Sequence, residues 1–362
     1  MNTNSIEVAL SLTAPMHVAY PDNYVKSEGL SKTITQTITV GDKKMSLPYY
    51  PANGFRGGLR RVIADMICDS IAVTEGTISG ELYNGLHCGA SSSSPDQTAK
   101  SIEEIIRARS HVYMGLFGGG ARTHESMYAA SDMLPILNAT ISAGMVPARY
   151  RDGYVSQIVG KDGVVRHIEP YELIDARHFV RIDDLYRVMD PVGINKTVTS
   201  PVEAVTSHQE AIGIHRAQDE EILKNEGKKH PRDVSQLQSV QTIAAGTPMF
   251  FRIDMKSDAT EAQAGALLLG IAGLLTQNNF GCMGRWGFGR VKPLDISMNF
   301  GGELTGGLFE NNAEFSMPEN MARYVDQARK EIAAIRTADI AAFFEDFSAD
   351  KKAAKKAAKA AQ

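Results

Sequence analysis

The glycine- and arginine-rich stretch at residues 49–61, YYPANGFRGGLRR, constrains the fold of this chain most. Apolar residues recur at helical spacing after it, which predicts a helix that has Asn53 as its N-cap and buries one face. Arg56 and Arg60 lie one turn apart beside that face, and the positive end of the helix dipole adds to the same corner. Such a basic corner suits a phosphate group. An amphipathic helix with an exposed basic side explains the same residues equally well.

Two adjacent glycines, Gly57 and Gly58, lie in the first turns of this predicted helix. Each glycine costs about 1 kcal/mol of helix stability relative to alanine. They leave a surface without Cβ atoms, which a ligand backbone or a neighbouring element can approach closely. We therefore place both glycines, together with Arg61, in the predicted binding surface.

A second glycine-rich stretch, GCMGRWGFGRV at residues 281–291, alternates glycines with arginines and aromatic rings. It follows a Leu-rich helical pattern and leads into a strand-like run. Nucleotide-binding loops have the reverse order, from strand to helix, and no GxxxxGK[ST] motif is present, so nucleotide binding is disfavoured. Arginines and aromatic rings suit the phosphates and bases of a single strand, although the two rings can equally pack the loop itself. The candidates are Arg285, Trp286, Gly287, Phe288, Gly289 and Arg290.

The composition limits the possible function classes. With 362 residues, 43% of them hydrophobic, the chain can form one large or two moderate domains. Its net charge of −4 lacks the overall positive charge typical of nucleic-acid-binding proteins. Any RNA contact must therefore use a local stripe of basic residues. Three cysteines without CxxC spacing disfavour a disulfide framework or a zinc site and favour a reducing compartment. Without a signal peptide or a membrane-spanning run, we expect a cytoplasmic protein that does not contact membranes.

Periodicity along the chain predicts the core order strand, helix, strand, strand, helix, strand. This is the split βαβ pattern of an α+β protein with a ferredoxin-like or RRM-like core and large insertions. The residues at 171–181 read as a strand next to the one at 250–255, with a polar insertion between them. The expected strands and helices are at 5–13, 53–71, 171–181, 250–255, 267–275 and 291–300.

The predicted domain organisation is one core, residues 1–300, that carries two insertions. The first, at 75–145, is a helical, finger-like insertion, and the second, at 182–240, is a polar arm. A helical extension follows at 301–346, and the chain ends in a basic, Ala-rich tail at 347–362 that is expected to be dispensable.

Three blocks that occur in one order carry a resemblance to a known family. They are LPYYPANGFRGGLRR at 47–61, LFGGG followed by SDMLPI within 116–136, and AAGTPMFFRIDM through GRWGFGRV within 244–291. Together they resemble the RAMP superfamily of CRISPR proteins, and within it the Cas-seven type backbone subunit, most like the type IV version. The resemblance implies a thumb at 182–240 that reaches over a neighbouring subunit. A surface insertion without that role is the alternative.

The resemblance also implies a function and partners. It implies a non-catalytic subunit that binds guide RNA (crRNA), multimerises along it as a head-to-tail filament of copies of itself, and presents it to complementary target DNA. Other CRISPR complex subunits, a guide-processing nuclease and a DinG-like helicase are the implied partners, with no cofactor. A subunit that accepts any guide sequence needs phosphate and ribose contacts rather than base-edge contacts.

One further basic residue, Arg122, follows the three glycines of LFGGG. It is a candidate for phosphate contact, and a loop arginine that serves only solubility is an equal alternative. With Asn53 and Arg122, the predicted RNA-binding residues are complete. They are Asn53, Arg56, Gly57, Gly58, Arg60, Arg61, Arg122, Arg285, Trp286, Gly287, Phe288, Gly289 and Arg290.

The sequence contains no recognisable catalytic motif. Its nine histidines form no HExxH or HxH pattern, and no GxSxG is present, so neither a metal site nor a triad is expected. Type III relatives cut target RNA with an aspartate between the first strand and the basic helix, and Asp22 and Asp42 lie in that region. Relatives that process guide RNA use histidine, and His17 is the histidine in that region. A RAMP-family endoribonuclease that cuts target or precursor RNA is therefore the alternative function.

Overall fold

The computed structural model describes most of the chain, which divides into two compact units. The larger unit contains Met1–Ala19, Thr33–Asp175 and Thr242–Gln362, and the smaller contains Tyr20–Lys32 and Ala176–Gln241. Most of the predicted arm at 182–240 and the whole tail at 347–362 lie outside the described residues. No helix in the described part is long and apolar enough to span a membrane. The described residues are 4–19, 30–89, 100–159, 163–181, 199–200, 236–308 and 317–344.

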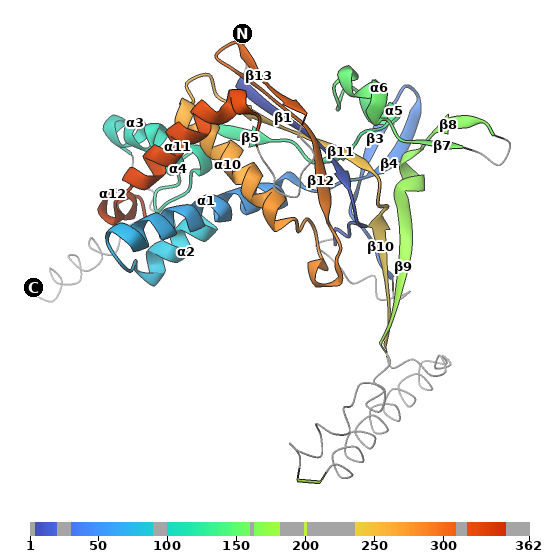
Figure 1. Cartoon of the computed structure of the whole chain (residues 1–362), viewed down its shortest axis with the longest axis horizontal. Helices are drawn as coiled ribbons and strands as arrows, with labels where there is room; N and C mark the ends of the chain where they lie inside the picture. The colour runs from blue at the N-terminus through green and yellow to red at the C-terminus, as the bar shows by residue number, and fades with distance from the viewer. Residues whose placement is uncertain are drawn as a thin grey trace, which may run out of the picture. The chain divides into compact units, whose positions relative to one another are not determined.

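A central antiparallel sheet organises the larger unit (Figure 1). Strand β1 lies between β12 and β11, and β11 also pairs with two short strands, β5 and β6. If β5 and β6 are taken together as the second core strand, the spatial order is fourth, first, third, second, with β13 added beside β12. This is the ferredoxin-like order, so the predicted α+β fold class is confirmed. The strands are β13 (Glu303–Leu308), β12 (Val291–Phe300), β1 (Asn4–Leu12), β11 (Pro248–Met255), β5 (Tyr128–Ala130) and β6 (Leu134–Pro135).

Two long helices, α1 (Ala52–Thr74) and α10 (Glu261–Gln277), lie in the core connections and pack on each other. A Cβ atom on Gly58 would lie 2.7 Å from Leu274 Cδ2, so this glycine lets the second turn of α1 approach the end of α10. Helix α11 (Ala322–Ala334) also packs on α10. The remaining helices are α2 (Gly80–Cys88), α3 (Ile102–Ser110), α4 (Val112–Phe117), α5 (Asn138–Ser142), α6 (Arg151–Tyr154) and α12 (Thr337–Ala341).

The strand predicted at 171–181 forms, but not in the central sheet. It is β9 (Ile174–Arg181), which pairs with β10 (Gln236–Ile243) in a separate sheet that also contains β2 (Leu30–Ser31). The prediction that it lies beside the strand at 250–255 is therefore wrong. That position is taken by β5 and β6, which are three and two residues long. Strands of two or three residues are too short to show the alternation of apolar and polar residues. The hydrophobic pattern therefore favours the longer segment at 171–181 as the second core strand.

Two hairpins complete the larger unit. Strands β3 (Thr35–Val40) and β4 (Lys43–Pro48) pair before α1. Strands β7 (Gln157–Val159) and β8 (Val165–His167) form the second hairpin. The first hairpin leads directly into the basic stretch at the start of α1.

The outer strand of the central sheet, β13, is capped by a side chain. The backbone N–H of Gly306 donates to Asn320 Oδ1, and Asn320 Nδ2 donates to the Gly306 carbonyl, both at 3.2 Å. The side-chain amide thus forms the pair of hydrogen bonds that the peptide group of another strand forms in an antiparallel ladder.

A half-buried histidine, His111, joins α3 to α4. Its Nδ1 accepts hydrogen bonds from the backbone N–H groups of Tyr113 and Met114 at 3.1 and 3.2 Å, which requires an unprotonated Nδ1. Burial lowers the pKa of His111 from 6.5 to about 4, an effect partly offset by Asp339. Between these two pH values, His111 is therefore protonated in the unfolded chain and neutral in the folded protein.

Stability is lost as the pH falls from the pKa of His111 in the unfolded chain toward its lower pKa in the folded protein. We therefore expect His111 to lower the free energy of unfolding by roughly 2–3 kcal/mol between pH 7 and pH 4.5. Urea unfolding at both pH values measures this loss. The control is His111→Asn, whose side-chain oxygen can cap α4 without titrating. An identical pH dependence in the wild type and this variant would contradict the assignment.

Candidate nucleic-acid interface

Helix α1 begins differently from the prediction. Its N-cap is Pro51, which provides no side-chain hydrogen bond. The Ala52 N–H instead donates to Asp132 Oδ1 at 2.8 Å, from the segment between β5 and β6. The prediction of Asn53 as N-cap is therefore wrong, because a carboxylate 80 residues away fills that role. Asn53 itself is exposed as the second residue of the helix.

The three arginines of α1 face two directions. The guanidinium carbon of Arg56 lies 5.5 Å from the ring centroid of Tyr128 on β5. Arg60 Nη2 donates to the carbonyl of Phe117 at the end of α4, at 2.7 Å. Arg61 is exposed, and a Cβ on Gly57 would lie 3.4 Å from its Nη1. Arg56 and Arg60 thus line the side of α1 next to β5 and α4.

Tyr50 joins the start of α1 to residues 281–290, which we call the glycine loop. Its ring packs edge-on against Phe280, with the centroids 6.1 Å apart. Burial raises the pKa of the Tyr50 hydroxyl, while a hydrogen bond with the Gly281 backbone and the charge of Arg61 lower it, so both groups lie near the hydroxyl. Two stretches far apart in the sequence therefore meet at Tyr50, with Arg61 on the shared side.

The glycine loop exposes its arginines and its tryptophan and buries Phe288 and Gly289. Trp286 is 48% exposed, whereas Phe288 is only 7% exposed and packs the loop. A Cβ on Gly289 would lie 1.7 Å from the Phe280 carbonyl oxygen, so only glycine fits this close approach. The exposed predicted residues are Arg285, Trp286, Gly287 and Arg290.

The segment after β1 holds the glycine loop in place. The Gly289 N–H donates to the Pro15 carbonyl at 2.9 Å, and the Cys282 N–H donates to the His17 carbonyl at 2.8 Å. Met283 has a φ of 64°, a left-handed conformation that is uncommon for a residue with a side chain. Strain of this kind persists only where neighbours fix the backbone, and it clusters at binding sites.

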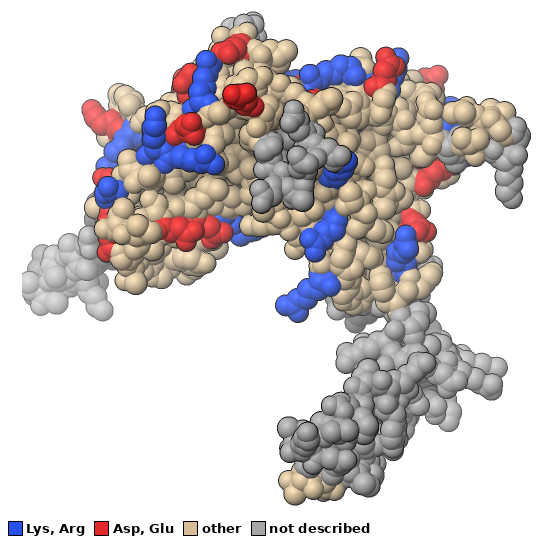
Figure 2. Space-filling view, viewed as in Figure 1, with Lys and Arg blue, Asp and Glu red and all other residues tan. Residues whose placement is uncertain are grey.

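The arginines of α1 and of the glycine loop have no carboxylate partner among the described residues. Three arginines elsewhere in the larger unit, Arg109, Arg149 and Arg252, each pair with an Asp or Glu. Basic side chains gather over the loop between α10 and β12 on the face shown in Figure 2. A chain with a net charge of −4 thus keeps a local positive potential here. The arginines without an ion pair in this part of the protein are Arg56, Arg60, Arg61, Arg285 and Arg290.

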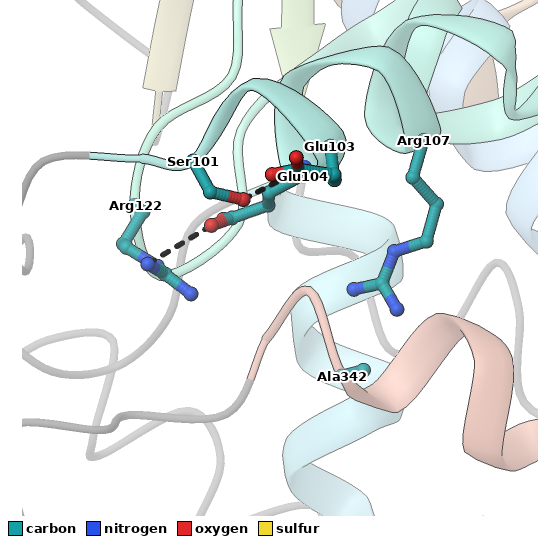
Figure 3. Close-up of a pocket in the computed structure, with 6 residues that line it drawn as sticks. All are labelled: Ser101, Glu103, Glu104, Arg107, Arg122 and Ala342. Carbon is teal, nitrogen blue, oxygen red and sulfur yellow. Dashed lines mark hydrogen bonds and ion pairs between the residues drawn. The ribbon is translucent and has the colours of Figure 1, made fainter.

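Arg122 lies in a separate pocket of about 380 Å³ (Figure 3). Its Nη1 pairs with Glu104 Oε2 at 2.9 Å, and the same carboxylate approaches His124 Nε2 at 3.4 Å. The structure therefore does not bring Arg122 together with the other candidates, and Glu104 neutralises its charge. The pocket is lined by Ser101, Glu103, Glu104, Arg107, Arg122 and Ala342.

Comparison with known proteins gives matches among solved structures alone. No protein-family model and no curated protein matches the chain. Two of the similar structures are chains of CRISPR effector complexes. A chain of "Type IV-B CRISPR Complex" is 14% identical with a TM-score of 0.44, covering 88% of this chain and 96% of that one. A chain of "Cryo-EM structure of the Type III-B Cmr-beta bound to cognate target RNA" is 12% identical with a TM-score of 0.35, covering 82% and 61%.

A metal-dependent nuclease needs a cluster of metal-ligating side chains. No three His, Cys, Asp or Glu side chains come together in the described part of the chain as a metal site requires. Asp42 is exposed in the turn between β3 and β4, and Asp22 lies outside the described residues. Asp42 therefore has no described partner for catalysis, and the nuclease alternative stays a prediction.

The sequence does not reveal two further residues at this interface. Tyr128 contacts Arg56, and Asp132 caps α1, and both lie in or just before the SDMLPI block. Because β5 has only three residues, its pattern gives no signal that Tyr128 faces the basic helix. The block itself, which follows the glycines of LFGGG in the resemblance, is the one available hint.

Proposed function

We propose that this chain is the repeating subunit that coats the guide RNA of a type IV CRISPR effector complex, and that it binds RNA without cutting it. The observation that carries this proposal is the set of five arginines on α1 and the glycine loop that have no carboxylate partner in the described part. Arginine recognises phosphate through paired N–H donors, and an exposed indole such as Trp286 stacks on a base. The sequence blocks that resemble the RAMP superfamily contain these same residues.

In this function, copies of the chain associate head-to-tail along one RNA strand, and the RNA sets the length of the filament. Contacts with phosphate and ribose accept any guide sequence, and the guide itself recognises complementary target DNA by base pairing. Other CRISPR complex subunits, a guide-processing nuclease and a DinG-like helicase are the expected partners.

Co-expression with a guide RNA, followed by size-exclusion chromatography with light scattering, tests the coating function. The expected product is a multimer whose absorbance shows bound RNA. A monomer free of nucleic acid would exclude this function.

The nuclease alternative is tested by incubating the purified protein with labelled guide precursor and with guide plus complementary RNA, in the presence of divalent metal. We expect no products. Cuts at regular intervals that disappear in Asp22→Ala or Asp42→Ala would replace the proposed function with an endoribonuclease.

Trp286 gives a direct optical readout, because it is the single tryptophan of the chain. We expect saturating single-stranded RNA to quench its fluorescence, because a base stacks on the half-exposed indole. Trp286→Ala should weaken binding about tenfold, since one stacked base contributes roughly 1–3 kcal/mol. Unchanged emission at an RNA concentration that saturates a filter-binding assay would remove Trp286 from the interface.

A further inference from the structure

The pocket that contains Arg122 has a second arginine, Arg107, in its wall (Figure 3). Arg107 comes from α3 and Arg122 from the loop after α4, and the two side chains extend into the pocket from opposite sides. Glu104 pairs with Arg122, whereas Arg107 forms no ion pair with any described residue. One guanidinium group of this pocket therefore has no carboxylate partner.

Phe343, which follows α12, fixes the position of both arginines. Its ring lies 4.7 Å, centroid to guanidinium carbon, from Arg107. Its carbonyl accepts the Ala121 N–H at 2.9 Å, one residue before the other arginine. The rings of His111 and His124 pack edge-to-face with that of Phe343, with centroids 5.5 and 5.8 Å away. A guanidinium that is already held in place loses less side-chain entropy when it binds an anion.

The two acidic side chains of the pocket differ in their contacts. Glu104 is shared by Arg122 and His124 Nε2, at 2.9 and 3.4 Å. Glu103 is exposed, and hydrogen bonds from its own N–H and from the Ser101 hydroxyl lower the pKa of its carboxyl group. Because Glu103 forms no ion pair with a described residue, its carboxylate can accept hydrogen bonds from the hydroxyl groups of a ligand.

We propose that this pocket binds a small phosphate monoester that carries hydroxyl groups, which is the chemistry of a sugar phosphate or a nucleoside monophosphate. Arg107 donates two N–H groups to two phosphate oxygens, because a guanidinium matches a phosphate with paired donors. Arg122 donates to a third oxygen from the opposite side while its Nη1 stays on Glu104. The carboxylate of Glu103 accepts from the hydroxyl groups.

The size and the place of the pocket agree with a ligand of this kind. Its volume of about 380 Å³ is in the range of small-molecule sites and exceeds what a phosphate group alone fills. The lining residues belong to α3, to the loop after α4 and to the end of α12, so none of them is an arginine of α1 or of the glycine loop. The proposal therefore does not depend on the proposed RNA-binding function.

The test compares Arg107→Gln with Arg109→Gln, two residues apart on α3. Arg109 is the matched control, because it pairs with Asp258 at 2.7 Å and does not line the pocket. At constant ionic strength, ribose 5-phosphate and AMP should raise the Tm of the wild type and of Arg109→Gln but not that of Arg107→Gln. Arg107→Lys, which keeps the charge and loses the paired donors, should bind them about tenfold more weakly than the wild type in calorimetric titrations.

The choice of ligand separates the sources of the phosphate group. Tighter binding of AMP than of ribose 5-phosphate identifies a nucleotide, and equal binding identifies a sugar phosphate. Inorganic phosphate should bind more weakly than both, since it makes no contact with Glu103. An equal Tm rise in Arg107→Gln and the wild type, or equal affinity for all three ligands, would overturn the proposal.

Two further measurements keep this site apart from the RNA interface. Replacing Arg61, Arg285 and Arg290 by glutamate in each of these proteins removes phosphate bound at the RNA interface from the calorimetric signal. With the three arginines intact, Arg107→Gln should bind single-stranded RNA as tightly as the wild type. A loss of RNA affinity as large as that in Trp286→Ala would place the pocket on the path of the RNA and exclude a small-molecule site.

Discussion

Reversing the charge of Arg61, Arg285 and Arg290 together should lower the affinity for single-stranded RNA about a thousandfold at physiological salt. Each arginine is exposed and has no carboxylate partner in the described part, so each is free to contact a phosphate. A hydrogen bond to a charged group contributes roughly 1.5–3 kcal/mol, and 1.4 kcal/mol corresponds to a factor of ten. Fluorescence anisotropy with labelled RNA measures the change.

The salt dependence provides a second measurement of the same contacts. Replacing the three arginines by glutamine should reduce the slope of log affinity against log salt by about 2, since each phosphate contact to a single strand contributes about 0.7. The charge-matched control reverses Arg323, Arg329 and Arg336, which lie on or beside α11 and pair with carboxylates. An equal loss of affinity in the control would show that total charge, rather than this interface, binds RNA.

Gly265→Ala should destabilise the fold by roughly 3 kcal/mol or more, the upper range for overpacking a core. A Cβ on Gly265 would lie 1.8 Å from the backbone carbonyl oxygen of Tyr324, so α10 and α11 must move apart. This effect is opposite in sign to the usual gain of about 1 kcal/mol for glycine to alanine in a helix. Thermal and urea unfolding measure it.

The control for this variant is Gly80→Ala at the first position of α2, where nothing lies within 4 Å of the added Cβ. We expect this control to be as stable as the wild type or slightly more stable. A Gly265→Ala variant as stable as the control would mean that α10 and α11 do not pack at this distance.

The sequence predicts the long elements of this fold well, because each has a clear period. The alternating run around Val8 is β1, which lies within one residue of the expected bounds. The Leu-rich run around Leu268 is α10, which begins six residues before the expected range. The second core strand could not be found in the same way. Its two pieces, β5 and β6, are recognisable only from their pairing with β11, and pairing partners are not visible in a single sequence.

In the candidate site, too, features set by neighbouring residues in the sequence are predictable, and features set by tertiary contacts are not. The exposed arginines of the glycine loop follow from local pattern alone. The N-cap predicted at Asn53 is wrong, because Asp132 reaches the helix from a segment 80 residues away. The ion pair of Arg122 with Glu104 on α3 is likewise a tertiary contact that the local pattern does not reveal. RNA binding by these residues remains a prediction.

The Asn320 side chain on β13 has a consequence for any assembly with many copies held close together. An outer strand with unsatisfied peptide groups invites the same strand of another molecule to add to it, which leads to aggregation. At Gly306 both peptide groups are already bonded within the chain. Another molecule can therefore add a strand to β13 at this point only after Asn320 is displaced from Gly306.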